Sequence, residues 1–171
     1  MTNRTGPTVL LMLLCLLPLV ATGQTPASDE DITYSADGGG NIVIRDGLRV
    51  TTLQGNVEIR QGLMQLYGDT ASLEQDPDTG DIVRVIVEGS PARFARDATE
   101  DSARITGRSE SITYYTEEGE SGPVTAIRFS GNAAFNSGRT ALQCTEIRYL
   151  PDTGETTSTG PCSGTVAPGE L

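Results

Sequence analysis

The chain contains no histidine, no lysine and no tryptophan, and few aromatic residues of any kind. Histidine is the commonest general base and the commonest metal ligand, so its absence argues against hydrolytic or metal-dependent chemistry. The only basic residues are arginines, and an excess of acidic residues gives a net charge of −11. A chain this negative repels nucleic acids at long range. We therefore expect no enzyme activity, no catalytic residues, no cofactor, no bound metal and no nucleic-acid partner.

Long apolar runs are also missing. The longest, from Val9 to Val20, is too short to span a bilayer as a helix, which takes about 20 residues. It follows Arg4 and precedes the small residues Ala21 and Gly23, a pattern typical of a secretory signal. We predict a cleaved signal peptide over residues 1–23 and a flexible lead-in over residues 24–31.

Cysteine is scarce, and removal of residues 1–23 leaves only Cys144 and Cys162. In an oxidising compartment these two residues can form a disulfide. Two free thiols are the alternative. We expect the disulfide, with Cys162 attaching the C-terminal tail to the last strands.

From Ile32 onward, apolar and polar residues alternate in short segments such as "RVTTLQGNVEIR", "DIVRVIVEG" and "VTAIRFSGNAAF". This period of two is typical of half-buried strands, and no useful length shows helical spacing. Clusters of Pro, Asp and Gly, such as "DPDTGD" and "LPDTGE", separate the segments and favour tight turns. The sequence therefore predicts an all-β domain, with boundaries at residues 32 and 160 and a tail over residues 161–171.

One pattern occurs twice: "LQGNVEIRQG" ends at Gly62, and "FSGNAAFNSG" ends at Gly138. With the two Gly-Asn steps aligned, Leu66 falls on Leu142 and Leu73 on Tyr149. A glycine in the middle of a strand permits a bulge or a sharp bend. Strands that bend at one place in each copy can stack into an elongated, flattened roll with an apolar interior.

Two acidic stretches resemble functional sites but are better explained as turns. "DPDTGD", from Asp76 to Asp81, has the spacing of a calcium loop but lacks a later bidentate glutamate, so we expect a hairpin turn. Glu117, Glu118 and Glu120 lie beside glycines, so we expect a solvated loop rather than a pair of catalytic carboxylates.

The ordered series "TLQGNVEIRQGLMQLYGDTASL", "VEGSPARF", "ITGRSESITYY" and "IRFSGNAAFNSGRTALQCTEIRYL" resembles the LptA/OstA-like family of periplasmic lipopolysaccharide-transport proteins. The resemblance implies an OstA-like β-jellyroll, an elongated V-shaped stack of two antiparallel sheets whose interior shelters the acyl chains of lipid A. It also implies a periplasmic location. The implied partners are lipopolysaccharide, an inner-membrane jellyroll partner, the outer-membrane translocon and, by head-to-tail joining, further copies of the chain.

Alternation predicts which side chains face the interior. In "VRVIVEG", Val83, Val85 and Val87 share one face. In "IRFSGNAAF", Ile127 and Ala133 share a face with Phe129 and Phe135. The family resemblance adds positions in the first strand and in "PARF". The complete set of predicted lipid-binding residues is Ile32, Tyr34, Leu53, Val57, Ile59, Phe94, Ile105, Ile112, Tyr114, Phe129 and Phe135.

Alternative functions remain open at this point. One is a secreted β-solenoid enzyme acting on polysaccharide, although such enzymes usually have a longer solenoid and a groove of Asp, Arg or Lys. Another is the membrane-anchored jellyroll partner of the same transport system, and a third is a structural repeat module.

Overall fold

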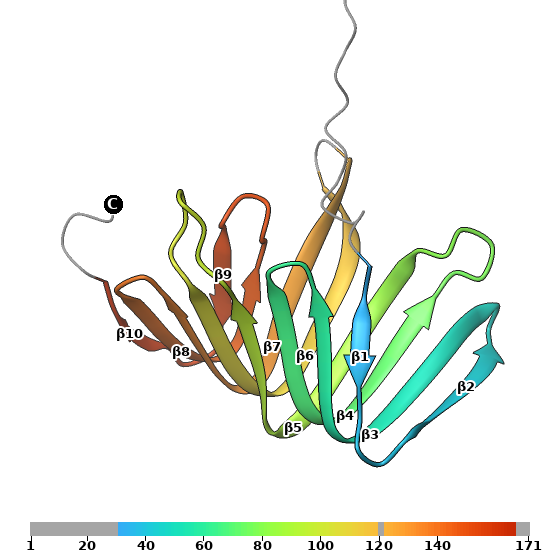
Figure 1. Ribbon diagram of the computed structural model, residues 1–171. Helices are drawn as coiled ribbons and strands as arrows, with labels where there is room; N and C mark the ends of the chain where they lie inside the picture. The colour runs from blue at the N-terminus through green and yellow to red at the C-terminus, as the bar shows by residue number, and fades with distance from the viewer. Residues whose placement is uncertain (1–30, 120–121, 167–171) are drawn as a thin grey trace, which may run out of the picture.

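The computed structural model describes residues 31–119 and 122–166, and every regular element within them is a β-strand (Figure 1). The strands are β1 (Thr33–Ser35), β2 (Gly40–Arg45), β3 (Leu48–Gln61), β4 (Met64–Gln75), β5 (Ile82–Arg96), β6 (Ile105–Gly119), β7 (Gly122–Ser137), β8 (Thr140–Tyr149), β9 (Thr156–Thr159) and β10 (Ser163–Thr165). The all-β prediction is confirmed. The predicted signal peptide, and the lead-in except Asp31, lie outside the described residues.

Strands that follow one another in the chain lie side by side in the sheet. All pairs are antiparallel, in the order β1-β3-β4-β5-β6-β7-β8-β10, while β2 pairs with the other half of β3 and β9 with the other half of β8. Each strand from β3 to β8 therefore forms one rung of a stack. The first rung is split into β1 and β2, and the last is split into β9 and β10.

The sheet folds along a line that crosses the middle of its long strands. The pairing register shifts between Gln54 and Val57 in β3, and similar shifts interrupt the other pairs at neighbouring positions up to β8. Figure 1 shows this line at the bottom of the molecule and the turns at the top. The V shape of the predicted jellyroll is confirmed, and its two layers are halves of the same strands. We call them the β1 layer, which ends in β1 and β10, and the β2 layer, which ends in β2 and β9.

The two Gly-Asn steps lie on the fold line, and both residues of each step have positive φ. Glycine and asparagine adopt this conformation more readily than other residues. Each asparagine amide also donates to a carboxylate of the preceding rung. Asn56 Nδ2 lies 2.7 Å from Asp37 Oδ2, and Asn132 Nδ2 lies 2.6 Å from Glu110 Oε1. The repeated motif thus sets the bend of a strand and attaches it to its neighbour.

The hairpin turns also follow the repeat. Gly62 and Gly138 have nearly equal positive φ values of 54° and 55°, in the turns before β4 and β8. The "DPDTGD" segment forms the hairpin turn between β4 and β5, as predicted. There the Asp76 carboxylate accepts hydrogen bonds from the backbone N–H groups of Asp78 and Thr79.

Three details differ from the sequence prediction. Glu117 and Glu118 belong to the end of β6, directly before its last residue Gly119, rather than to a loop, and Glu120 lies outside the described residues. Val83 is exposed, because an irregularity at the start of β5 brings Ile82 against the core instead. The sheet continues beyond residue 160, since β10 pairs with β8.

Candidate functional site

The candidate site is the groove between the two layers, where the inward faces of the strands meet. Nine of the predicted lining residues lie in this interior and are at most 9% exposed: Leu53, Val57, Ile59, Phe94, Ile105, Ile112, Tyr114, Phe129 and Phe135. They come from strands β3, β5, β6 and β7 and from both layers. The interior is therefore one continuous apolar surface that runs along the stack.

The inward side chains of the first rung are more exposed to solvent than these nine buried residues, although they point toward the same interior. Tyr34 pairs with the buried Ile59, so it faces the interior, yet it is 50% exposed. Ile32 is partly buried against the core. At this end the groove is open to solvent.

Two further residues of the first rung were not predicted from the sequence. Ile42 and Ile44 of β2 alternate with Gly40, which pairs with Leu53, so both face the groove. They are 59% and 65% exposed. The alternation in "NIVIR" predicts the strand, but the face that it buries depends on its register with β3.

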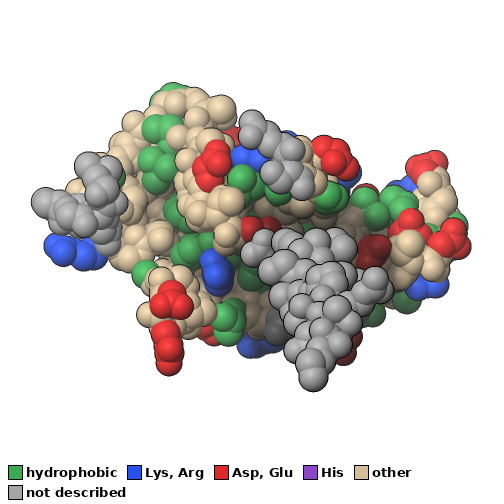
Figure 2. Space-filling view, turned by 90° about the horizontal axis from the view of Figure 1, so that it is seen from above, with side chains coloured by type: hydrophobic (Ala, Val, Ile, Leu, Met, Phe, Trp, Pro, Cys, Tyr) green, Lys and Arg blue, Asp and Glu red, His purple; other side chains and the backbone are tan. Residues whose placement is uncertain are grey.

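The open part of the groove has a volume of about 970 Å³. It begins at Ile32 and Tyr34, follows the β2 layer past Leu73 and Tyr114, and reaches Asp152 in the turn between β8 and β9. Seen from above, apolar side chains lie in the hollow between the polar turns (Figure 2). With strands spaced ~4.8 Å apart, the eight rungs extend over roughly 34 Å.

Toward the last rungs, aromatic rings fill the interior. All three phenylalanines of the chain, Phe94, Phe129 and Phe135, pack together with Tyr149, and neighbouring ring centroids lie 5.2–6.3 Å apart. The rings come from both layers, and each of the four residues is at most 4% exposed. The groove is thus open at the first rung and filled by this ring cluster near β7 and β8.

Polar groups in the interior are few and have partners. Burial raises the pKa of the Tyr114 phenol, while its hydrogen bond with Thr125 acts in the opposite direction. The buried Ser109 hydroxyl donates to the carbonyl of Ser111 at 2.7 Å. Among the described residues, no buried side-chain nitrogen or oxygen lacks a partner. Such a lining suits a long apolar ligand that forms no specific hydrogen bonds.

Comparison with known families gives this groove a context. Residues 40–155 match the family described as "LptA/(LptD N-terminal domain) LPS transport protein". The chain belongs to this family. The match covers β2 to β8, which include every strand that runs through both layers. Membership makes the chain a component of lipopolysaccharide transport rather than an enzyme, as predicted from the sequence, and it excludes the β-solenoid enzyme.

A solved structure shares the fold. It is that of LptH from Pseudomonas aeruginosa, described as the LptA-homologous periplasmic component of the lipopolysaccharide transport device. The superposition has a TM-score of 0.67 at 17% identity and covers 84% of this chain and 100% of LptH. The predicted jellyroll is thereby confirmed. A search of the curated proteins found no match. Within the described residues, no helix is long and apolar enough to cross a membrane.

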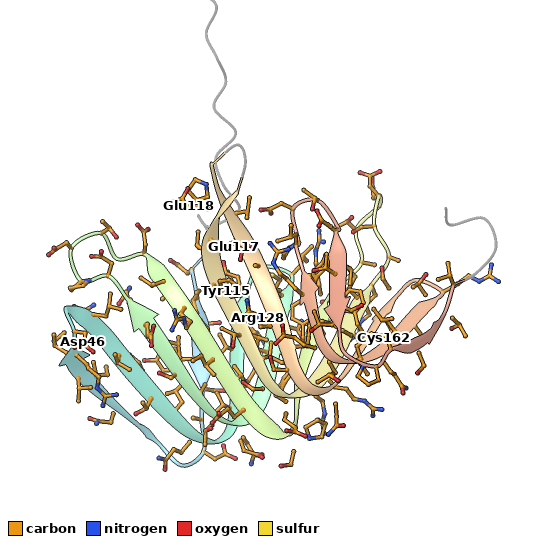
Figure 3. All side chains as sticks on the ribbon, turned by 180° about the vertical axis from the view of Figure 1, so that it is seen from behind. Asp46, Tyr115, Glu117, Glu118, Arg128 and Cys162 are labelled. Atoms are coloured by element: carbon orange, nitrogen blue, oxygen red, sulfur yellow. A yellow bond between two sulfur atoms is a disulfide. The ribbon has the colours of Figure 1, made fainter. Side chains whose placement is uncertain are left out.

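The outward face of β6, β7 and β8 is polar and forms ion pairs. Figure 3 shows Tyr115, Glu117 and Arg128 on this face. Arg128 Nη2 donates to the Tyr115 hydroxyl at 2.9 Å, and its guanidinium lies over the Tyr115 ring. Arg148 donates to Glu117, and this hydrogen bond lowers the pKa of the carboxyl. These two arginines and Glu117 thus lie on the outward face, although charged side chains such as Arg49 and Asp81 line the open part of the groove.

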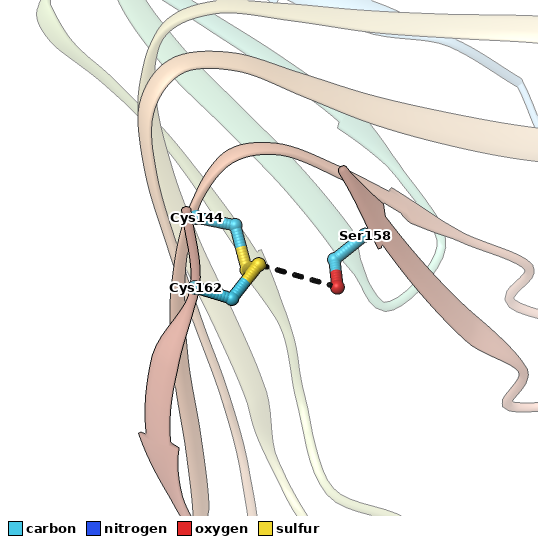
Figure 4. Close-up of a disulfide and its surroundings, with 3 residues drawn as sticks. All are labelled: Cys144, Ser158 and Cys162. Atoms are coloured by element: carbon cyan, nitrogen blue, oxygen red, sulfur yellow. Dashed lines mark hydrogen bonds between the residues drawn. A yellow bond between two sulfur atoms is a disulfide. The ribbon is translucent and has the colours of Figure 1, made fainter. Parts of the chain in front are cut away.

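A disulfide joins Cys144 of β8 to Cys162, with the two Cα atoms 4.3 Å apart. Cys162 Sγ also lies 3.5 Å from the Ser158 hydroxyl of β9 (Figure 4). Cys162 lies directly before β10, so this covalent bond attaches the last rung to β8. The two sulfurs lie near the fold line, at the end of the groove opposite to the open first rung.

Proposed function

We propose that this protein is a periplasmic carrier that binds lipopolysaccharide and shelters the acyl chains of lipid A in the groove. The observation that supports this most directly is the exposure of Tyr34, Ile42 and Ile44. These side chains lie on the inward face of the sheet, toward the groove, and yet remain largely accessible to solvent. An acyl chain laid along them would remove apolar surface from water, which is worth about 0.8 kcal/mol for each buried methylene group.

The proposal includes a bridge between the two membranes. Within the described residues, β1 and β2 pair only with β3, and β9 and β10 only with β8. Both ends of the stack therefore present strands with one unpaired edge, which can accept a strand from another domain. Through these edges the groove would continue into the inner-membrane jellyroll partner at one end and the outer-membrane translocon at the other, or into further copies of the chain.

Photo-crosslinking tests the lipid-binding part. A photoreactive phenylalanine analogue replaces Tyr34, which faces the groove, and in a matched variant it replaces Ser35, the exposed neighbour on the same strand. Purified lipopolysaccharide should crosslink at position 34 and much less at position 35. Equal labelling at the two positions, or none at position 34, would refute binding in the groove.

Fractionation tests the location. The mature chain should be recovered from the periplasmic fraction with an N-terminus near Gln24. If the chain is found in the membrane fraction with Met1 retained, the membrane-anchored jellyroll partner becomes the better assignment.

Size-exclusion chromatography across a range of concentrations tests the joining of copies of the chain. It should show end-to-end oligomers, and their absence would remove self-joining from the proposal.

A further inference from the structure

One arginine crosses the groove from layer to layer. Arg96 ends β5 in the β1 layer, and its Nη1 atom donates to the Tyr149 hydroxyl at 3.0 Å and to the Pro151 carbonyl at 3.4 Å. Tyr149 and Pro151 lie at the end of β8 and in the following turn, which belong to the β2 layer. These hydrogen bonds connect the two layers directly, far from the fold line.

The register of β5 makes Arg96 an inward residue. It pairs with Ile105 on one side and with Met64 on the other, and both of these pack in the core. Its neighbour along the same face, Phe94, belongs to the ring cluster. A cation on the inward face of an apolar groove is costly unless it is paired, so its position calls for an explanation beyond solubility.

The bridge stands at the boundary between the two parts of the groove. The open part extends to Asp152, the residue next to Pro151. Beyond it, Tyr149 accepts the hydrogen bond from Arg96 with its hydroxyl and packs against Phe135 with its ring, at a centroid distance of 5.2 Å. The Tyr149 side chain thus ends the open part of the groove with its hydroxyl and completes, with its ring, the cluster that fills the remaining part.

We propose that Arg96 and Tyr149 form a latch that limits how far a lipid enters the groove. Acyl chains occupy the open part next to the first rung while the latch is closed. They reach the last rungs only when the guanidinium leaves Tyr149 and the two layers separate. The hydrogen bonds are individually weak, so an incoming ligand or a docked partner can replace them. This inference rests on the proposed function, because it assigns regulation to the same groove.

Photo-crosslinking at two depths tests the latch. One probe replaces Tyr34 in the open part, and another replaces Leu142, a partly buried inward residue of β8 that pairs with Phe135 beyond the ring cluster. With purified lipopolysaccharide, the unmodified latch should give labelling at position 34 and little at position 142. Arg96→Ala removes both hydrogen bonds and should raise the ratio of labelling at 142 to that at 34 at least about fivefold, the factor that corresponds to losing one of them.

Two further variants separate the latch from general loosening. Arg93→Ala removes an exposed arginine from the outward face of the same strand and should leave the ratio unchanged. Tyr149→Phe removes only the hydroxyl, leaves the Pro151 carbonyl as an acceptor, and should raise the ratio less than Arg96→Ala. Melting temperatures of all variants identify any that are misfolded.

The outcomes separate the latch from the proposed function. Labelling at position 34 with equal labelling at 142 before any latch mutation overturns the latch alone. So does a ratio that Arg96→Ala leaves unchanged, or one that Arg93→Ala raises equally. An absence of labelling at both positions in every variant overturns the proposed function, and the latch with it.

Discussion

The first and last rungs have the same architecture but present opposite chemistry to the groove. The inward residues of the first rung include Tyr34, Ile42 and Ile44, which are large, apolar and largely exposed. In the last rung, Thr156 and Ser158 occupy the inward positions of β9 opposite Tyr149 and Ile147. One end of the stack is thus an uncovered apolar surface, and the other end is small and polar.

The difference shows that the two ends are held in different ways. A rung with apolar inward side chains gains stability when something covers it, whether a ligand or a neighbouring domain. A rung of small polar side chains gains almost nothing from burial, so its attachment depends on the strand pairing and on the Cys144–Cys162 disulfide. The following variants test this contrast between the open part of the groove at the first rung and the filled part near the last rung, which the disulfide attaches to β8.

The largest expected effect comes from a charge placed in the filled part. Phe129→Asp would bury a carboxylate within the ring cluster, at a site that is 0% exposed. Unpaired burial costs several kcal/mol, or the carboxyl stays protonated. We expect a large loss in the free energy of unfolding in denaturant titrations. Ile42→Asp, on the same inward surface but in the open part, should change stability by less than about 0.5 kcal/mol and should weaken lipopolysaccharide crosslinking instead.

Asn136→Asp serves as the control for the Phe129 variant, because Asn136 is exposed on the outward face of the same strand. Ser130 is less suitable, since its hydroxyl donates to Glu146 at 3.2 Å and an aspartate there would face that carboxylate. If Ile42→Asp destabilises the protein as much as Phe129→Asp does, the distinction between an open and a filled part of the groove is wrong.

Removal of the disulfide should have the next largest effect. The cysteines are 18 residues apart in sequence, and closing a loop of that size contributes roughly 3 kcal/mol to stability. In a variant that combines Cys144→Ala with Cys162→Ser, amide hydrogen exchange should accelerate in β9 and β10 and stay unchanged in β1 and β2. Unchanged exchange in β9 and β10 would show that strand pairing alone holds the last rung.

A smaller effect is expected at Gly107, which makes room for the ring cluster. A Cβ atom at this position would lie 2.3 Å from Phe129 Cε1. Gly107→Ala should therefore cost about 1–3 kcal/mol by overpacking, as measured by chemical denaturation. Thr106→Ala, at the preceding position on the opposite face, should cost less. Equal losses would mean that the Phe129 ring moves aside freely.

The smallest effect is expected at the Gly-Asn steps. Replacing Asn132 with glycine keeps positive φ accessible and removes only the hydrogen bond to Glu110, so the expected loss is about 0.5–1.5 kcal/mol. Asn56→Gly removes the equivalent bond to Asp37, which ties the bend of β3 to the first rung. Its effect should appear mainly as faster amide exchange in β1 and β2. If both variants lower global stability equally, the first rung is as firmly integrated as the interior.

The sequence predicts much of this fold because its signals are local. Alternation identifies the strands, and the repeated Gly-Asn step identifies where they bend, since only a few residue types accept positive φ. Nine of the eleven predicted lining residues lie buried between the layers for the same reason. The boundaries were less predictable. β10 is only three residues long and lies after Pro161, and it owes its place in the sheet to its pairing with β8.

What the sequence does not predict depends on contacts between distant segments. The exposure of Tyr34 and Ile42 arises because, within residues 31–119 and 122–166, the first rung pairs with strands on one side only, which alternation cannot show. The bridge from Arg96 to Tyr149 joins residues 53 positions apart that no motif relates. The division of the groove into an open and a filled part likewise follows from side-chain size and register in the folded structure.

The fold line has a mechanical consequence. Because each strand from β3 to β8 runs through both layers, neither layer can slide past the other without breaking the chain's own hydrogen-bond ladder. The remaining soft motion is a change in the angle between the layers, with the bends as hinge points. Neighbouring rungs share backbone hydrogen bonds on both sides of the line, so widening at one rung exerts a torque on the next. The stack therefore behaves as a series of coupled hinges. Widening the angle between the layers at one end of the stack would tend to widen it at the next rungs, toward the other end.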